Sequence, residues 1–311
     1  MRRSVPLALF FLPLVLAAGG CEIAEGDWGN SNRYKEDFSY DFKLAQGGRL
    51  EVESFNGSIE VVGWDNDAVQ VRGTKSASQQ EVVKELNIEA TGDTGQVRLR
   101  AVRPTPNCHC GVSFTIKVPR KTRIERADTS NASLRIESID APARVHTSNG
   151  SIKIYDVSGD LEATTSNASI DAEKLSGSAV FRTSNGRIHG DAIRGSLEAR
   201  TSNSSIDLAV TEADPTHPII LNSSNGSITL SLSTWKGNEI RANTSNSSIN
   251  LRLPDSLDAR VHASTSNGSI DTDYEVTTSH LSKTLLEGKI GNGGPLLDLQ
   301  TSNGSIRIKK R

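Results

Sequence analysis

The stretch Thr147-Ser148-Asn149-Gly150-Ser151-Ile152 decides how this chain folds, because variants of it recur until Thr301-Ser302-Asn303-Gly304-Ser305-Ile306 near the end of the sequence. The repeat is marked by its asparagine, which stands at Asn131, Asn149, Asn167, Asn185, Asn203, Asn225, Asn246, Asn267 and Asn303. The first four differences in residue number are equal, at 18 (149 minus 131), and the next are 22, 21, 21 and 36. A regular spacing of about 20 residues is typical of a solenoid in which each unit forms one coil.

The residues between the asparagines predict β-strands rather than helices, because apolar and polar side chains alternate and β-branched residues are frequent. When the equally spaced units are aligned, residues of one chemical kind fall in columns: Ile152, Ile170, Ile188 and Ile206; Val157, Leu175 and Ile193; Leu161, Ala179 and Leu197; and Gly159, Gly177 and Gly195. Such columns indicate strands that stack in register around a common core. We therefore expect an all-β fold, a single-stranded parallel β-helix or β-solenoid, with right-handed winding favoured.

The asparagine column itself predicts a ladder. Strands of successive coils lie about 4.8 Å apart, so identical amides can donate and accept along the axis. We expect the asparagines to face inward, as the isoleucines do, and the threonines Thr147, Thr165, Thr183 and Thr201 to bond from coil to coil in the same way. The asparagines also match the glycosylation acceptor pattern, but the repeat alone accounts for these matches.

The sequence before the array predicts a β-rich N-terminal cap region over residues 38–127, followed by the solenoid over 128–311. Within the cap, Gln79 to Leu86 has the spacing of a short amphipathic helix. Phe55-Asn56-Gly57-Ser58-Ile59 is a first, degenerate copy of the repeat. The long interval before Asn303 contains a predicted loop excursion over 274–299, which we interpret as a degraded coil that covers the C-terminal end.

Residues 1–20 have the pattern of an export signal, since Arg2 and Arg3 precede an apolar stretch too short to span a bilayer comfortably. Leu16-Ala17-Ala18-Gly19-Gly20-Cys21 resembles the lipobox of bacterial lipoproteins, which predicts lipidation of Cys21. Ala18 departs from that pattern, so cleavage as an ordinary secretory signal remains the alternative. Residues 21–37 are predicted to be a flexible tether between the lipid and the fold.

Cys108 and Cys110 are the two cysteines left once Cys21 is assigned to the lipid. In an oxidising compartment they can form a disulfide. With His109 between them they could instead offer three ligands to zinc or copper, but the sequence shows no fourth ligand, so we predict no metal site. No cofactor is expected either.

The charge of the chain limits the classes of partner that it is expected to bind. It has 35 basic and 37 acidic residues, a formal net charge of −2, which lacks the basic surplus of a nucleic-acid binder. The expected contacts are the membrane, through the N-terminal lipid, and an envelope protein or glycan, with self-association as an alternative. These place the protein in the bacterial cell envelope, lipid-anchored at the outer membrane or cell surface, or in the periplasm or medium if Cys21 is not lipidated.

These motifs together resemble a family of bacterial cell-envelope proteins of unknown function, which are built from β-strand repeats and labelled as adhesins. The resemblance covers about Phe38 to Ile308. Its carriers are the Phe55–Ile59 copy followed by Gly63-Trp64-Asp65, the tandem repeats, and Leu286-Glu287-Gly288-Lys289-Ile290-Gly291. The resemblance implies a β-helix fold and no catalytic residues, so it supports the architecture more than an activity.

Three functions fit the sequence. The first is a non-enzymatic, envelope-anchored scaffold or adhesin, and a second is a signalling or stress-response partner in the envelope. The third is a carbohydrate-active lyase or hydrolase, because parallel β-helices can carry outward carboxylates on adjacent coils. Its candidate residues are Asp171, His189 and Asp207, which fall in one outward column with Arg135 and Lys153. We see no aromatic side chain beside this column to hold a sugar, and we expect the protein not to be an enzyme.

Overall fold

A computed structural model describes residues 34–311, which form two long β-sheets and one short helix. The predicted signal over 1–20, the predicted lipidation site Cys21 and most of the predicted tether lie outside these residues. The tether was expected to extend to residue 37, but the first strand already begins at Tyr34. β1 includes Tyr34 because it pairs antiparallel with β4 along its whole length, beginning with Tyr34 opposite Ala77, and its alternating Phe38, Tyr40 and Phe42 pack against the core.

The first sheet, here called sheet A, has 13 strands. In spatial order it contains β1 (Tyr34–Lys43), β4 (Ala68–Ala77), β7 (Cys110–Pro119), β3 (Ile59–Trp64), β9 (Leu134–Ile139), β11 (Ile152–Ser158), β13 (Ile170–Ser176), β15 (Ile188–Gly195), β17 (Ile206–Ala213), β19 (Ile228–Leu232), β21 (Ile249–Leu253), β27 (Ile306–Lys310) and β23 (Ile270–Thr272).

The second sheet, here called sheet B, has 14 strands. In spatial order it contains β24 (Val276–Leu281), β25 (Leu285–Ile290), β22 (Ala259–Thr265), β26 (Leu296–Thr301), β20 (Ile240–Asn243), β18 (Ile219–Asn222), β16 (Leu197–Arg200), β14 (Ala179–Arg182), β12 (Leu161–Thr164), β10 (Ala143–Thr147), β8 (Arg123–Thr129), β2 (Arg49–Glu53), β6 (Gln96–Val102) and β5 (Asn87–Gly92).

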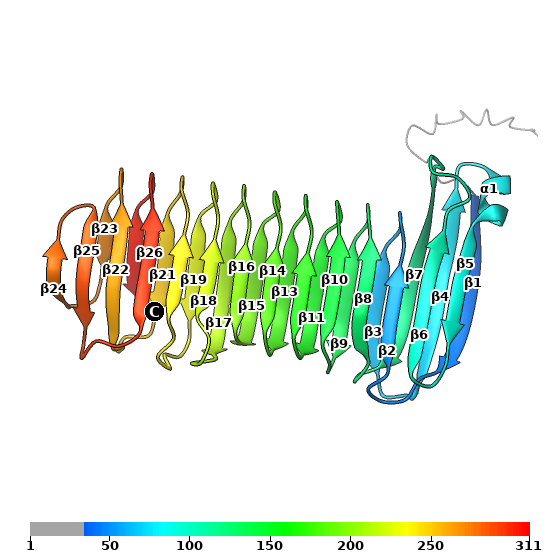
Figure 1. The fold of residues 1–311 in the computed structure, drawn as a ribbon, viewed down its shortest axis with the longest axis horizontal. Coiled ribbons are helices and arrows are strands. Elements are labelled where there is room, and N and C mark those ends of the chain that lie inside the picture. Colours follow the sequence, from blue (N-terminus) through cyan, green and yellow to red (C-terminus); the bar gives the residue numbers. More distant parts are fainter. Residues whose placement is uncertain (1–33) are drawn as a thin grey trace, which may run out of the picture. The chain divides into compact units, whose positions relative to one another are not determined.

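Each coil contributes one strand to sheet B and the next strand to sheet A, and the strands of neighbouring coils run parallel (Figure 1). The register matches the repeat, because Ile152 pairs with Ile170 and Ile170 with Ile188. The predicted all-β fold with stacked parallel strands is therefore confirmed.

Two turns close each coil. The turn from sheet B to sheet A carries the repeat asparagine and is here called the asparagine corner. The turn from sheet A to sheet B is here called the glycine corner.

At the N-terminal end, the array begins earlier than the boundary at residue 128 that the sequence predicted. Strands β2 and β3 form a coil that pairs in parallel with β8 and β9, and β6 and β7 form a further coil on its other side. The degenerate copy at Phe55–Ile59 is thus a true coil turn. Only β1, β4, β5 and the helix α1 (Gln80–Glu85) remain as a cap, and their strands pair antiparallel. The helix, predicted from its spacing, is confirmed and buries Val83 beside Leu86.

The C-terminal end departs from the order of the sequence. The coil formed by β26 and β27 lies between the coil of β20 and β21 and the coil of β22 and β23. The predicted excursion over 274–299 contains the antiparallel strands β24 and β25 and the first strand of this inserted coil. The N-terminal end shows the same exchange, since β2 and β3 precede β6 and β7 in the chain but lie inside them. At both ends, therefore, a coil is inserted next to the regular array.

The core fills the space between the two sheets with the predicted columns. Ile152, Ile170, Ile188 and Ile206 are fully buried. The glycine corner requires its glycines, because Gly177 has φ +127° and a Cβ there would lie 2.6 Å from the carbonyl oxygen of Gly159. The largest fully buried side chain in the middle of the array, Phe181, lies between Ala163 and Ala199 on the neighbouring strands, so bulk in one coil is balanced by small residues in the next.

Candidate functional site

The outward column that contains the three candidate catalytic residues is present on sheet A. Asp171 pairs with His189 across β13 and β15, and His189 pairs with Asp207 across β15 and β17. Asp207 is already paired, since Arg187 donates to it at 2.8 Å and also lies 3.3 Å from the His189 ring nitrogen. The hydroxyl of Ser169 donates to Asp171 at 2.9 Å. The column is thus a hydrogen-bonded, partly exposed surface.

An aromatic side chain does lie beside this column, contrary to the expectation from the sequence. Tyr155 lines the same shallow depression of about 310 Å³ as Asp171 and His189. It escaped notice because it belongs to the neighbouring outward column, two residues farther along the strand. Lys174 lies over its ring, 4.6 Å from the centroid, and donates to its hydroxyl. Tyr155 is therefore already in contact with a neighbouring cation.

The asparagine corner carries a continuous ladder of amides. Asn149 Nδ2 donates to Asn131 Oδ1 at 2.7 Å, and the same bond joins each following coil. The ladder reveals the inserted coil, because Asn303 donates to Asn246 and Asn267 donates to Asn303. All the amides donate toward the N-terminal end.

The expected inward orientation of these asparagines is wrong. All nine repeat asparagines are exposed, whereas the threonine two residues earlier in the repeat is buried, as Thr147 and Thr165 show. The strand ends at that threonine or one residue before it, so the alternation of inward and outward side chains no longer applies at the asparagine. Water can therefore replace the amide bonds, and the buried threonines form the sheltered ladder.

The threonine ladder bonds one backbone to the next. Thr183 Oγ1 donates to the Ala168 carbonyl of the preceding coil at 3.1 Å and accepts the Gly186 N–H of its own turn at 3.2 Å. Thr147 makes the same two bonds, and Thr201 makes the first of them, to the Gly186 carbonyl. A Cβ at Gly186 would lie 1.6 Å from the Ala168 oxygen, so this close approach excludes any side chain there.

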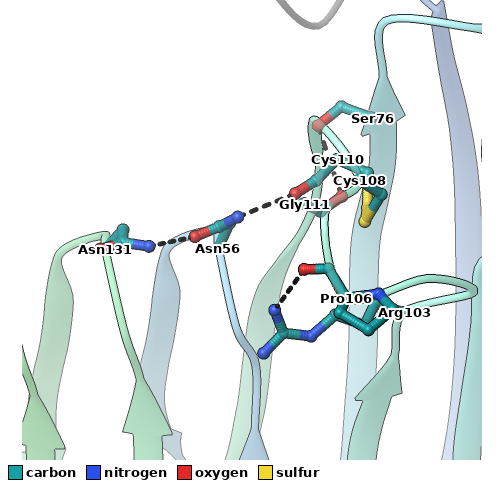
Figure 2. Close-up of a disulfide and its surroundings, with 8 residues drawn as sticks. All are labelled: Asn56, Ser76, Arg103, Pro106, Cys108, Cys110, Gly111 and Asn131. Atoms are coloured by element: carbon teal, nitrogen blue, oxygen red, sulfur yellow. Dashed lines mark hydrogen bonds between the residues drawn. A yellow bond between two sulfur atoms is a disulfide. The ribbon is translucent and has the colours of Figure 1, made fainter.

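The N-terminal end of the asparagine ladder meets the two cysteines (Figure 2). Cys108 and Cys110 are joined by a disulfide, with their Cα atoms 5.2 Å apart. Asn131 donates to Asn56, and Asn56 Nδ2 donates to the Cys110 carbonyl at 3.1 Å. The disulfide loop therefore stands where the next asparagine turn would be, and its carbonyl accepts the last amide of the ladder. Within residues 34–311 no group of three or more His, Cys, Asp or Glu side chains could hold a metal ion.

A larger groove lies at the glycine corner near the C-terminal end, and sequence reasoning did not identify it. It has a volume of about 870 Å³ and is lined by the loops that lengthen the later repeats. Its side chains include Trp235, Lys236, Asp255, Asp258, Asp273, Tyr274, Glu275 and Lys310. The signal in the sequence is the lengthening of the repeat after Asn203, which leaves room for longer turns, including the one that contains Trp235.

None of the helices described is long and apolar enough to cross a membrane.

None of the curated proteins compared with the chain matches it. Among solved structures, the chain is similar to a "putative cell adhesion protein" from Clostridium sporogenes, at 11% identity and TM-score 0.23, over 89% of this chain and 100% of the other. A "putative lipid binding protein" from Parabacteroides distasonis matches at 11% identity and TM-score 0.27, over 90% and 98%. A "putative adhesin" from Bacteroides fragilis matches at 10% and 0.25, over 89% and 97%.

The family comparison covers nearly the whole of the described fold. The model of the family described as "Toastrack DUF4097" matches residues 47–309. That span begins just before β2, the first strand of the parallel array, and ends within β27, the inserted last coil. The cap strand β1 lies outside the match, while both exchanged coils lie within it. The chain belongs to the toastrack DUF4097 family.

Proposed function

We propose that this protein is a non-enzymatic scaffold or adhesin of the bacterial cell envelope, wound as a right-handed solenoid and anchored through a lipid on Cys21. The observation that supports this most is the difference between the inward and the outward residues of the array. The inward columns repeat with little change, whereas the outward residues differ from coil to coil and are free to specify a partner.

The outer faces support a binding role because they are stiff and polar. On sheet B, Arg182 bridges Glu162 and Glu198 on the strands at either side, each at 3.0 Å. Arg144 bonds Glu162 as well, at 3.1 Å. Such cross-strand pairs fix the positions of surface charges and leave little reorganisation for a partner to impose.

A non-enzymatic role also agrees with the state of the candidate column. A carboxyl that acts as a general acid is typically held in a buried, apolar environment. Asp207 instead is partly exposed and accepts from Arg187, and Asp171 is partly exposed and accepts from Ser169. If the protein cleaved polysaccharide, Asp171→Asn and Asp207→Asn would abolish the cleavage. We expect wild-type protein and both variants to give the same background in such an assay.

The anchor and the binding role are tested together in cells. Wild-type protein should fractionate with membranes and incorporate labelled fatty acid, whereas Cys21→Ser should appear in the soluble fraction. Affinity capture with the lipidated full-length protein should retain an envelope protein or glycan that a Cys21→Ser preparation still binds. A wild-type protein that carries no lipid, or that retains nothing from envelopes or cells, contradicts the proposal.

A further inference from the structure

The groove at the C-terminal glycine corner is built by four connections that are longer than the glycine-corner turns of the regular coils at Gly159, Gly177 and Gly195. They are the β19–β20 loop, the β21–β22 loop, the β23–β24 connection and the β25–β26 loop, and they meet at the lower ends of the strands at the C-terminal end (Figure 1). The inserted coil brings in the last of these loops and also Lys310. The exchange of coil order thus places segments from residue 235 to residue 310 around one cavity of about 870 Å³.

Some of the lining residues hold the loops in place. Tyr274 is 6% exposed, and its hydroxyl lies 2.9 Å from the Leu253 carbonyl and 2.7 Å from the Pro254 carbonyl, to which it donates. Asp258 accepts the N–H of Asn292 at 2.8 Å. Asp273 pairs with Lys309 at 2.8 Å. The groove is therefore held in shape by its own hydrogen bonds before any ligand arrives.

Other lining groups remain uncommitted. The carboxylates of Asp255 and Glu275 are exposed and form no hydrogen bond or ion pair with any residue in the described part of the chain. Trp235 is partly exposed and contributes to the wall of the groove. An indole beside free carboxylate oxygens combines an apolar surface with strong acceptors.

This combination suits a sugar. A pyranose ring offers an apolar face of C–H groups to an aromatic ring and hydroxyl donors at its edge to carboxylates. The lining holds four carboxylates and two lysines, so its charge is −2 and disfavours polyanions. A volume of about 870 Å³ falls in the upper part of the usual range for ligand pockets, which fits an oligosaccharide better than a single sugar.

We infer that this groove binds a neutral or amino-sugar oligosaccharide, with Trp235 as the stacking surface and Asp255 and Glu275 as acceptors for its hydroxyl or ammonium groups. The inference rests on the proposed adhesin or scaffold function and names the chemistry of its partner. Tyr274 and Asp258 are positioning residues, because their bonds are made to the protein.

The test is a titration of the full-length protein with chitin-type and cellulose-type oligosaccharides, with a polyuronate and a lysine-rich peptide as competing ligand classes. Tryptophan fluorescence should change saturably for the first two. Trp235→Phe should abolish the fluorescence change, whereas Trp64→Phe, whose indole donates to the Ala68 carbonyl at 2.8 Å far from the groove, should preserve it. Calorimetry should show about tenfold weaker binding for Asp255→Asn and again for Glu275→Gln.

The matched control is Glu85→Gln, an exposed carboxylate on helix α1, which should bind as the wild type does. Because Asp255 and Glu275 bond to nothing in the described protein, their variants should unfold at the wild-type temperature, which separates lost binding from lost structure. Binding unchanged by all three groove variants, or a preference for the polyuronate or the peptide, overturns the inference. If the double variant Asp255→Asn and Glu275→Gln still binds cells or envelopes, the proposed function stands and the assignment of the groove as the binding site is wrong. If the wild-type protein binds neither cells nor envelopes, the proposed function itself fails.

Discussion

Replacing Thr183 by valine should destabilise the array more than replacing Asn185 by leucine, although Asn185 belongs to the more conspicuous ladder. Valine keeps the shape of threonine and removes only the hydroxyl. That loss leaves the buried Gly186 N–H without its acceptor and the Ala168 carbonyl without its donor. An unsatisfied buried group costs about 1–3 kcal/mol, so the two together predict a loss of about 2–6 kcal/mol.

Asn185 makes two amide bonds of 2.7 Å, one to Asn167 and one from Asn203, but its side chain is exposed. Water can satisfy the amides of Asn167 and Asn203 after the change, so the expected loss is about 1 kcal/mol. Urea unfolding followed by circular dichroism measures both values. Ser184→Ala is the control, because Ser184 is exposed and its hydroxyl bonds to none of the described residues, and it should change stability by less than about 0.5 kcal/mol. A leucine variant at 185 that loses as much stability as the valine variant at 183 would refute the assignment of the sheltered ladder to threonine.

Three further outcomes are expected. Gly186→Ala should cost about 2–3 kcal/mol in thermal or urea unfolding, because its Cβ would meet the Ala168 carbonyl at 1.6 Å, whereas Ala168→Gly should cost less than about 1 kcal/mol; equal losses would contradict this. Ala192→Gly should stabilise by about 0.5 kcal/mol, since Ala192 has φ +53°, and a loss of stability would show that this conformation carries no cost. Burial, with the charges of Asp255 and Asp273, raises the pKa of Tyr274 to about 12, so the stability that its neutral phenol contributes is complete below pH 10 and is lost as pH rises through 12. The difference in alkaline absorbance between wild type and Tyr274→Phe should have its midpoint at about that pH, and a midpoint near 10 would contradict the prediction.

The coil and its inward columns could be predicted because each depends on a pattern that the chain repeats. Ile152, Ile170 and Ile188 recur at a fixed spacing, and a fixed spacing of apolar side chains has one simple solution in a parallel stack. The glycine corner could be predicted for the same reason. The orientation of Asn149 could not, because alternation applies only within a strand and the strand ends at Thr147.

The exchanged coils at the two ends follow from the regularity that made the rest predictable. The coils at the C-terminal end present the same isoleucine and asparagine to either neighbour, so Asn246 accepts from Asn303 as readily as it would from Asn267. The repeated residues therefore determine which residue types meet across two neighbouring coils, but they do not determine which coil is the neighbour. The non-repeating hairpin of β24 and β25 decides the order of the coils at the C-terminal end. The left-handed backbone conformation of four residues could not be predicted from the sequence for a different reason, since none of them is a glycine or an asparagine. They are Ser138, Asp156, Lys174 and Ala192.

The groove could not be predicted because its parts share no pattern. Trp235, Asp255 and Glu275 come from three connections whose sequences are unrelated, and the inserted coil then places Lys310 beside Tyr274, with the ammonium 5.4 Å from the ring centroid. The inward columns tolerate these loops, since Ile228, Ile249 and Ile306 remain fully buried and in register on either side of them. A solenoid can thus acquire a binding site by lengthening its turns without changing its core. A binding site is expected where the repeat departs from its regular spacing, and the groove of about 870 Å³ lies at that departure.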